Sequence, residues 1–490
     1  MMRSLVTQVL CFVLGTFLLA GCGKGIVGDG DENLPPETYT IVKDIQRTGD
    51  GRFVSQIHVQ WWGDDPDGVV SGFELSSNKE DWTFTTRQDS VFLVQLPEGA
   101  DTFDFDFYVR AIDRQGEPDP TPAYLVYPVK NSAPEVAFDI PVGTPTNPGR
   151  WPDKTFPILQ LQWLLSDPDG EANIDYLEFF INDTTGKGIE ISKDFRSLTL
   201  EALDPEADVS DCRVLLGSVL EPHEETIGSM QLNAQNTFYI RATDKVGAKS
   251  WFVASKPIFI KKKVSDVLLV NAYSNGLDDR ENFYIENLIA AGINSFDTIR
   301  VNEVDGEFYT QLAVDNVTQS KIFALFDVLV WFGEDAPYTL TLAQRTTGDF
   351  LDKGGRMFAS VFFSAGIDPL SNYLEFTPID SLVNPGGGVF FMDKGAAAKP
   401  SEDGWPELSS TRILTSTRPF YPTFDVKPLY EAELKTASGE WTGPSVIMAK
   451  KEVAGKAQFI ISSVELYRLS GNENMDVLFN KIFKEELGLE

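Results

Sequence analysis

The sequence predicts a multidomain protein in which two all-β sandwiches are followed by an α/β domain with a doubly wound parallel sheet. Three observations support this prediction. The chain of 490 residues is longer than a single hydrophobic core usually supports. Residues 37–263 hold two copies of one pattern of short strands, and residues 264–490 alternate continuous apolar strands with helical segments. We therefore expect sandwiches over residues 37–130 and 131–263, and the α/β domain over residues 264–490.

The composition is that of a folded, strongly acidic protein. Hydrophobic residues make up 42% of the chain, which is enough for packed cores. The net charge of -32 repels phosphate backbones, so nucleic acid is excluded as a partner. Of the 3 cysteines, Cys11 and Cys22 belong to the N-terminal segment and only Cys212 remains for the body. The fold therefore depends on core burial and has no intrachain disulfide.

The N-terminal segment has the pattern of a secretory signal. Arg3 supplies a basic start, and residues 9–20 are apolar apart from Thr16, a run too short to serve as a transmembrane anchor. The run ends in Leu19-Ala20-Gly21-Cys22, which resembles the lipobox of bacterial lipoproteins. This resemblance implies a signal peptide over residues 1–21 and lipidation of Cys22. The alternative is an ordinary signal peptide cleaved near Ala20.

Residues 22–36 are predicted to form a flexible acidic tether, because Gly and acidic residues precede Pro35-Pro36. The residue after Cys22 is Gly23. In lipoproteins of Gram-negative bacteria, the absence of Asp at this position goes with sorting to the outer membrane. The resemblance therefore implies an outer membrane lipoprotein, with the periplasmic and surface faces both open.

The repeat consists of two pairs of matching segments. The first pair is Gln60–Gly68 and Gln162–Gly170, and the second is Phe107–Asp113 and Phe238–Asp244. Apolar and polar residues alternate in each, with a Trp early and a Tyr late, which is typical of immunoglobulin-like sandwiches. The pairing of Trp and Asp-Pro-Asp-Gly with Phe-Tyr-Val-Arg-Ala-x-Asp also resembles fibronectin type III-like modules of bacterial envelope proteins. That resemblance implies spacing and contact with protein or glycan, and no chemistry.

The Asp-Pro-Asp-Gly loops allow two interpretations. Asp65 and Asp67 in the first copy, and Asp167 and Asp169 in the second, could supply oxygens to Ca²⁺, which takes about six to eight of them. The simpler interpretation is a β-turn with Pro at its second position and Gly after it. We favour the turn and keep Ca²⁺ as the alternative; no other cofactor is expected.

After residue 264 the expected elements follow one another as strand and helix. Val267–Val270 is a continuous apolar strand, as expected when both faces of a parallel sheet are covered. The further predicted elements are helix 281–292, strand 296–301, helix 319–326, strand 327–332, helix 340–353, strands 356–361, 445–449 and 457–462, and helix 473–487.

This region resembles the class I glutamine amidotransferase-like superfamily. The resemblance rests on Phe326–Gly333, Phe350–Phe358 and Gly455–Ile461, and it implies a flavodoxin-like domain. Active members use a Cys with a His as base. No Cys follows Cys212, and both His lie in the sandwiches, so that arrangement cannot be assembled. Ser360 and Ser364 fall near the position of a nucleophile, and we interpret them as loop residues.

Ligands of such sheets bind beyond the carboxyl ends of the strands. The acidic residues after the first strand argue against phosphate there. The candidate ligand-binding residues are Tyr273, Asn275, Asp278 and Asp279 after the first strand, and Trp331, Glu334 and Asp335 after the third. Aromatic faces beside carboxylates suit a sugar, a peptide or a cation, although solvated loops with a half-buried Trp331 would show the same pattern.

The sequence as a whole predicts a non-catalytic envelope lipoprotein whose sandwiches present the α/β head for binding or assembly of envelope protein or glycan. Its partners would be the membrane, through the lipid anchor, and that protein or glycan. The alternative is a hydrolase of glycan or peptide that uses carboxylates such as Asp278, Asp279 or Glu334. A third possibility is a structural spacer.

Overall fold

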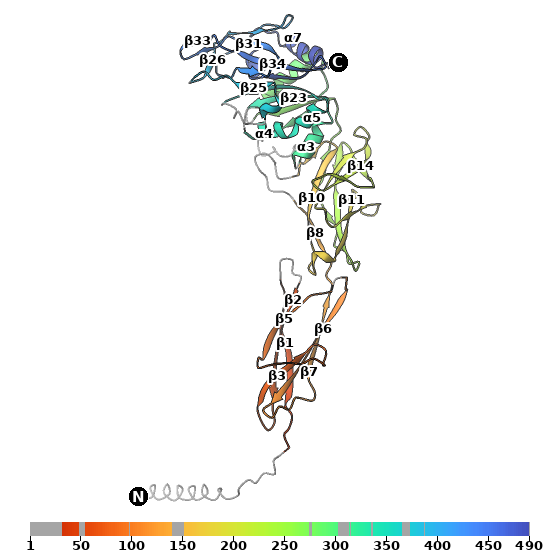
Figure 1. Ribbon diagram of the computed structural model, residues 1–490. Coiled ribbons are helices and arrows are strands. Elements are labelled where there is room, and N and C mark those ends of the chain that lie inside the picture. The colour runs from red at the N-terminus through yellow and green to blue at the C-terminus, as the bar shows by residue number, and fades with distance from the viewer. Residues whose placement is uncertain are drawn as a thin grey trace, which may run out of the picture. The chain divides into compact units, whose positions relative to one another are not determined.

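A computed structural model describes residues 32–48, 54–97, 99–139, 151–273, 277–301, 313, 315–334, 337–364, 373–386 and 388–489 (Figure 1). The chain divides into two compact units, Met1–Asn131 and Ser132–Glu490. Strands are much more abundant than helices in both. The lipobox, Asn275 and Asp335 lie outside the described residues.

The first unit is a β-sandwich of two antiparallel sheets. One sheet has the order β1 (Glu37–Thr48), β2 (Val54–Asp64), β5 (Asp89–Val94), and the other has the order β4 (Thr83–Thr85), β3 (Val70–Ser76), β6 (Thr102–Asp113), β7 (Ala123–Lys130). The predicted alternation is confirmed, because Ile57, Val59 and Trp61 are buried. Trp61 lies between the sheets and contacts Phe73 and Phe107.

The second unit begins with a larger sandwich. Its main sheet has the order β15 (Glu221–Pro222), β14 (Val209–Leu216), β13 (Ser197–Ala202), β10 (Ile158–Ser166), β8 (Glu135–Asp139), with β16 (Ile227–Gln231) also paired to β14. The facing sheet has the order β12 (Ile189–Ser192), β11 (Ile174–Ile181), β18 (Phe238–Asp244), β19 (Val253–Ala254). A small third sheet joins β17 (Ala234–Asn236), β20 (Ile258–Ile260) and β9 (Lys154–Thr155). The longer middle of the second copy thus forms β14, β15 and β16.

The head is built on a nine-stranded sheet. The first five strands are parallel, in the order β22 (Asp297–Arg300), β21 (Val267–Ala272), β23 (Val328–Glu334), β24 (Arg356–Phe362), β35 (Lys456–Ser462). Antiparallel strands continue it as β34 (Val446–Val453), β31 (Val426–Ala432), β27 (Ala397–Pro400) and β28 (Leu408–Ser409). If these five parallel strands are numbered as they occur along the chain, their order across the sheet is 2-1-3-4-5. The direction of winding therefore reverses between β21 and β23.

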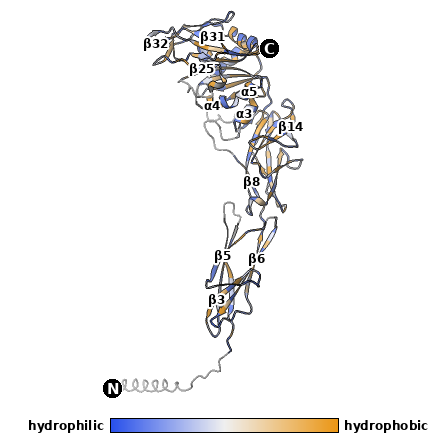
Figure 2. Cartoon of the chain, viewed as in Figure 1, coloured by the Kyte–Doolittle hydropathy of each residue, from blue (hydrophilic) through white to orange (hydrophobic). Residues whose placement is uncertain are grey.

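Both faces of the parallel strands are covered by apolar side chains. Leu269 belongs to a core with Tyr284 and Leu288 of α2 (Leu277–Ala290), α7 (Met475–Phe479) and the π-helix η4 (Asn480–Glu486). Leu268 belongs to the opposite core, with α3 (Asn316–Phe323), α4 (Pro337–Thr346) and α5 (Gly348–Asp352). This burial explains the continuous apolar strand, and Figure 2 shows the same concentration of hydrophobic residues on the strands of the head.

Several boundaries differ from the sequence prediction. The helix expected over residues 340–353 is two helices, separated where the Thr346 and Thr347 hydroxyls donate to the carbonyls of Leu342 and Ala343. The expected C-terminal helix is α7 followed by η4. The strands between β24 and β34 were not predicted from the sequence. Besides β27, β28 and β31 of the main sheet, they form two small sheets: β25 (Ile379–Leu382) with β30 (Phe420–Pro422), and, in spatial order, β29 (Leu414–Thr417), β26 (Phe390–Met392), β32 (Lys435–Thr436) and β33 (Gly439–Glu440). The short helix α6 (Tyr373–Phe376) precedes them.

The second sandwich and the head share apolar and charged contacts. Phe156 is part of the head's hydrophobic core, and its ring lies 5.1 Å from that of Phe326, edge to face. Lys321 of α3 pairs with Glu201 of β13, and Lys261 pairs with the buried Asp297. The second sandwich therefore packs directly against the head through an apolar contact and two ion pairs.

Candidate functional site

The predicted ligand residues do not all reach the carboxyl edge of the parallel strands. Tyr273 follows β21 at that edge, and Glu334 is the half-buried last residue of β23. Asp279 is exposed in α2, and the side chain of Asp278 lies outside the described part of the chain. Trp331 was predicted to follow the third strand, but it lies inside β23, is 3% exposed and packs against Phe323. Its ring therefore belongs to the core.

Arginine and tyrosine side chains gather at the same edge. We define the arginine–tyrosine cluster as Tyr273, Arg280, Arg412, Glu465, Tyr467 and Arg468. Tyr273 comes from the end of β21, Arg280 from the first turn of α2, and Arg412 from the segment before β29. The other three come from the turn after β35. Segments distant in sequence thus meet beside the strand pair where the winding reverses.

The guanidinium groups surround the two tyrosine rings. Arg280 lies 4.3 Å from the ring centroid of Tyr273 and 5.8 Å from that of Tyr467. Arg412 and Arg468 lie 6.0 and 5.6 Å from the Tyr467 centroid. Contacts at these distances are attractive, because the face of an aromatic ring carries partial negative charge.

A buried glutamate holds one side of the cluster in place. Glu465 is 1% exposed and forms an ion pair with Arg468. The Tyr467 hydroxyl donates to Glu465 Oε1 at 3.1 Å, and Arg468 Nε donates to the Tyr467 hydroxyl at 3.1 Å. These bonds fix the guanidinium of Arg468 and the ring of Tyr467 relative to the end of β35.

The hydroxyl group of Tyr273 is buried without a hydrogen-bond partner among the described residues. Its side chain is 0% exposed, and burial raises its pKa well above the usual value for tyrosine. A buried polar group without a partner costs about 1–3 kcal/mol. This cost would be recovered if a ligand atom accepted a hydrogen bond from the Tyr273 hydroxyl.

The serines near the expected nucleophile position have structural roles in the described residues. Ser360 is part of β24, so the loop assignment is wrong for this residue. Its hydroxyl is completely buried, accepts from the Leu466 backbone at 3.3 Å and contacts the Val464 carbonyl at 3.4 Å. Ser364 is exposed, and its carbonyl accepts from Arg418. No imidazole is present in the head to activate either hydroxyl.

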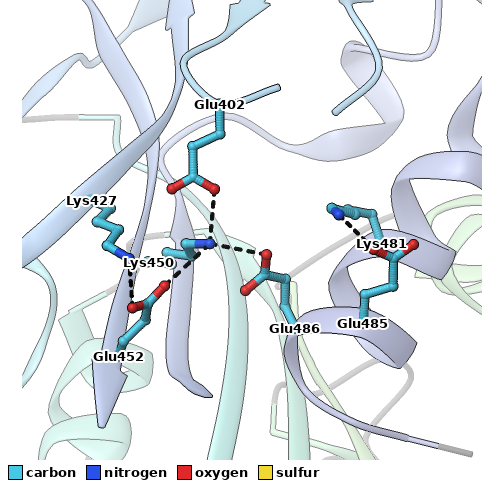
Figure 3. A network of polar contacts seen from close by, with 7 residues as sticks. All are labelled: Glu402, Lys427, Lys450, Glu452, Lys481, Glu485 and Glu486. Carbon is cyan, nitrogen blue, oxygen red and sulfur yellow. Dashed lines mark hydrogen bonds and ion pairs between the residues drawn. The ribbon is translucent and has the colours of Figure 1, made fainter. Parts of the chain in front are cut away.

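A second charged group lies on the antiparallel side of the sheet. Figure 3 shows Glu402, Glu452 and Glu486 arranged around the ammonium group of Lys450. The distances from Lys450 Nζ are 2.9, 3.3 and 3.0 Å, and the lysine side chain is only 5% exposed. Proximity to Lys427 and Lys450 lowers the pKa of Glu452. The contacts join β34 to η4 and to the segment after β27, which indicates a stabilising role.

The aspartates of the Asp-Pro-Asp-Gly loops accept hydrogen bonds from backbone groups in both sandwiches. Asp67 accepts from the Leu34 backbone, and Asp169 accepts from the Ser132 backbone at the equivalent position. Asp167 Oδ1 accepts from the backbone of Asp169 at 2.7 Å, while Asp167 Oδ2 is buried without a hydrogen-bond partner. Burial, together with the charges of Asp169 and Asp244, raises the pKa of Asp167 to about 6.

The bond between Asp167 and the Asp169 backbone is that of a turn, whereas the bonds to Leu34 and Ser132 join the loops to the start of each sandwich. No group of three or more acidic, His or Cys side chains in the described residues is arranged to hold a metal ion. Asp65 Oδ2 is likewise buried without a hydrogen-bond partner. The Ca²⁺ alternative for Asp65, Asp67, Asp167 and Asp169 therefore stays a prediction.

Sequence reasoning identified Tyr273 and missed Arg280, Arg412, Tyr467 and Arg468. Arg412, Tyr467 and Arg468 lie in segments for which the sequence predicted no helix or strand. A search for basic residues in the segments that follow the predicted strands would have found Arg280 and Arg468. Arg412 gives no such signal, because its place depends on the unpredicted strands.

Comparisons with known proteins assign no family. No family model matches the sequence, and no curated protein is significantly similar to it. Similar solved structures include the fibronectin(III)-like modules of CbhA from Clostridium thermocellum, at 14% identity over 42% of this chain and 85% of that chain, with a TM-score of 0.16. Scores of this size carry no argument about function.

Two enzymes are also among the similar structures. A β-glycosidase from Bacteroides vulgatus shares 11% identity over 46% of this chain, with a TM-score of 0.13. A β-1,2-glucanase from Parabacteroides distasonis shares 8% identity over 47% of this chain, also with a TM-score of 0.13. The alignments span 25% and 37% of the two enzymes. Separately, none of the helices in the described ranges has the length and apolar character needed to cross a membrane.

Proposed function

We propose that this protein is a non-catalytic cell-envelope lipoprotein whose two sandwiches present a binding head to envelope protein or glycan. The head would be a flavodoxin-like α/β domain, related in pattern to the class I glutamine amidotransferase-like superfamily. The proposal draws on the lipobox at Cys22 for attachment and on the repeat for the spacer.

The observation that carries this proposal is the composition of the carboxyl edge. An amidotransferase-like reaction needs a thiol and an imidazole there, and the head has neither residue type. Ser360, the nearest hydroxyl in β24, is completely buried and bonded to backbone groups. Besides the carboxylates of Glu334 and Glu465, the latter buried and paired with Arg468, the edge presents arginine and tyrosine side chains, which bind ligands well.

One experiment distinguishes a protein that only binds its ligand from an enzyme that cleaves it. The full chain is incubated with glycan and peptide arrays, and retained compounds are then analysed by mass spectrometry. Retention of an unaltered compound is expected. Cleaved products in place of retained compounds would overturn the proposal.

Attachment needs its own test, because the motif lies outside the described residues. Cells that express the chain are labelled with an alkyne-bearing fatty acid, and a Cys22→Ser variant serves as the control. Label is expected on the wild type alone, in the outer membrane fraction. Label on the Cys22→Ser variant, or none on the wild type, would contradict lipidation at Cys22.

A carboxylate-dependent hydrolase of glycan or peptide is the alternative, and one observation favours it. Glu402 Oε2 and Glu486 Oε1 bind the same ammonium group, so they are at most about 6 Å apart, within the roughly 5–9.5 Å typical of glycosidase carboxyl pairs. However, Lys450 lies between them and favours the ionised form of both, whereas a general acid must carry a proton. Hydrolysis that is lost in Glu402→Gln and Glu486→Gln variants would establish this alternative.

A further inference from the structure

We infer that the arginine–tyrosine cluster binds an oxyanion group, such as the carboxylate or sulfate of an acidic glycan or a phosphate. This inference rests on the proposed function, because it names the class of ligand that the binding head takes. The bound anion would lie against the Tyr467 ring, between the guanidinium groups of Arg280 and Arg412.

The first argument is the local charge. The cluster contains three arginines and one glutamate, which together give a charge of +2 in a chain whose net charge is -32. The negative charge of the whole protein repels anions at long range, so the positive cluster attracts an anion only when the anion is close. Such a site favours ligands whose shape lets them approach the arginines. Guanidinium groups suit this task, because their planar donors match carboxylate, sulfate and phosphate oxygens in pairs.

The second argument is the division of roles among the arginines. Arg468 is fixed by the buried Glu465 and by the Tyr467 hydroxyl, so it holds the ring in position. Arg280 and Arg412 approach the same ring from other segments of the chain. Arg412 is exposed, so it can reach a ligand arriving from solvent.

The third argument is the buried hydroxyl of Tyr273. This donor has no hydrogen-bond partner among the described residues, and the ring that carries it lies against the guanidinium of Arg280. A ligand oxygen that reached this hydroxyl would give it a hydrogen-bond acceptor. The site also occupies the position that is general for ligands of parallel sheets, beyond the carboxyl ends of the strands next to the reversal of winding.

Glu281, one of the acidic residues that follow β21 in the sequence, is engaged by residues outside the cluster. Glu281 is 8% exposed and is held by Asn271 at 2.7 Å and by Arg300 at 3.0 Å. Its carboxylate is therefore neutralised beneath α2. The inferred anion is bound by side chains of the cluster and does not need the start of α2.

The test is titration calorimetry of the full chain with oligogalacturonate, which carries a carboxylate on every sugar. A neutral galactose oligomer of the same length is the control ligand, and inorganic phosphate is the competitor. We expect binding of the acidic oligomer alone, weakened at high salt. Competition by phosphate would show that the site accepts any oxyanion, and its absence would show that the carboxylated sugar is the source of recognition.

Two substitutions locate the site. Arg280→Gln and Arg412→Gln should each weaken binding by about 10- to 100-fold, as expected for loss of a hydrogen bond to a charged group. Arg345→Gln, which changes an exposed arginine on α4, should have no effect. Arg468 is left unchanged because its loss would strand the buried Glu465. Circular dichroism confirms that each variant is folded.

The possible failures are distinguishable. No binding of any oxyanion, equal binding of the neutral oligomer, or binding that neither arginine substitution weakens would overturn the inference. The proposed binding function would survive these results if the arrays retained a different compound. Shortened oligogalacturonate after incubation would instead overturn the non-catalytic function and leave arginine-dependent binding intact.

Discussion

The guanidinium of Arg280 lies 4.3 Å from the centre of the completely buried Tyr273 ring. Arg280 lies in the first turn of α2 and Tyr273 directly follows β21, so this contact lies at the carboxyl edge of the sheet where the winding reverses. It places a charged group against a buried ring whose hydroxyl has no hydrogen-bond partner in the described part of the chain.

Removing the Tyr273 hydroxyl should not destabilise the free protein. Tyr273→Phe deletes a buried donor without a described partner, so we expect a free energy of unfolding that is unchanged or higher by about 1 kcal/mol. Tyr430→Phe is the matched control, because the Tyr430 hydroxyl donates to the Pro406 carbonyl at 2.8 Å and its loss should cost about 1 kcal/mol. Urea unfolding measures both. A larger loss in Tyr273→Phe than in Tyr430→Phe would show that Tyr273 has a partner.

Loss of Lys450 should destabilise the head. Lys450→Met leaves Glu402, Glu452 and Glu486 close together without their shared cation (Figure 3). Because these carboxylates are partly exposed, we expect a cost of about 1–3 kcal/mol, below that of a fully buried pair. Lys481→Met breaks a pair within one helical segment and should cost less than about 1 kcal/mol. Equal unfolding midpoints for the two variants in urea would contradict this role.

The contact between the second sandwich and the head should be needed for their joint unfolding. Phe156→Ala removes a buried ring from the shared core and should cost about 3–5 kcal/mol. We also expect calorimetry to show two separate transitions for Ser132–Glu490 in place of one. Phe424→Ala changes a fully exposed ring and should alter stability by less than about 0.5 kcal/mol. Retention of a single transition in Phe156→Ala would show that the two parts are coupled elsewhere.

Asp167 should make the second sandwich less stable as the pH rises. Its pKa is raised from 3.8 to about 6 in the folded chain, so the folded state holds the proton more tightly than the unfolded state does. The stabilisation by protonation is fully present below pH 3.8 and is lost as the pH rises through about 6. Between pH 5 and pH 7 we expect a loss on the order of 1 kcal/mol.

The Asp167→Asn variant tests this assignment, because its amide oxygen can still accept from the Asp169 backbone. The pH dependence of its urea midpoint should be smaller than that of the wild type. At pH 7 the variant should also be the more stable protein. A wild type and a variant with parallel pH profiles would exclude Asp167 as the titrating group.

The same pair of proteins decides between the turn and Ca²⁺. We expect the urea midpoint at pH 7 to be the same in Ca²⁺ and in chelator, because Asp167 accepts from the Asp169 backbone within a turn and Asp169 accepts from the Ser132 backbone. Asp183→Asn, in an exposed turn, is the control. A rise with Ca²⁺ in the wild type and Asp183→Asn, but not in Asp167→Asn, would establish a Ca²⁺ site.

The parts of the fold that depend on local pattern could be predicted from the sequence. Alternation around Trp61 and Trp163 identified the buried faces of both sandwiches, and both rings are 1% exposed. The apolar run at Val267–Val270 correctly located β21, because strands covered on both faces leave a continuous signal. The strands over residues 379–440 are mostly two to four residues long, too short for a period to be recognised.

The candidate site could be predicted only in part. Tyr273 was found from its place after a strand, which is a local property. Trp331 was placed wrongly, because a strand with both faces buried gives no alternation to show which residue reaches the edge. Arg412 and Arg468 reach Tyr467 through long-range packing, and one sequence carries no signal for such contacts.

The central claim is that the head binds without catalysis, and mass spectrometry of an array ligand after prolonged incubation tests it most directly. The wild-type chain and a Ser360→Ala variant are incubated with each retained compound, and both the bound and the free compound are weighed. The account predicts that the compound is recovered intact from both proteins and that both retain it equally. Cleavage of the compound by the wild-type chain would contradict it.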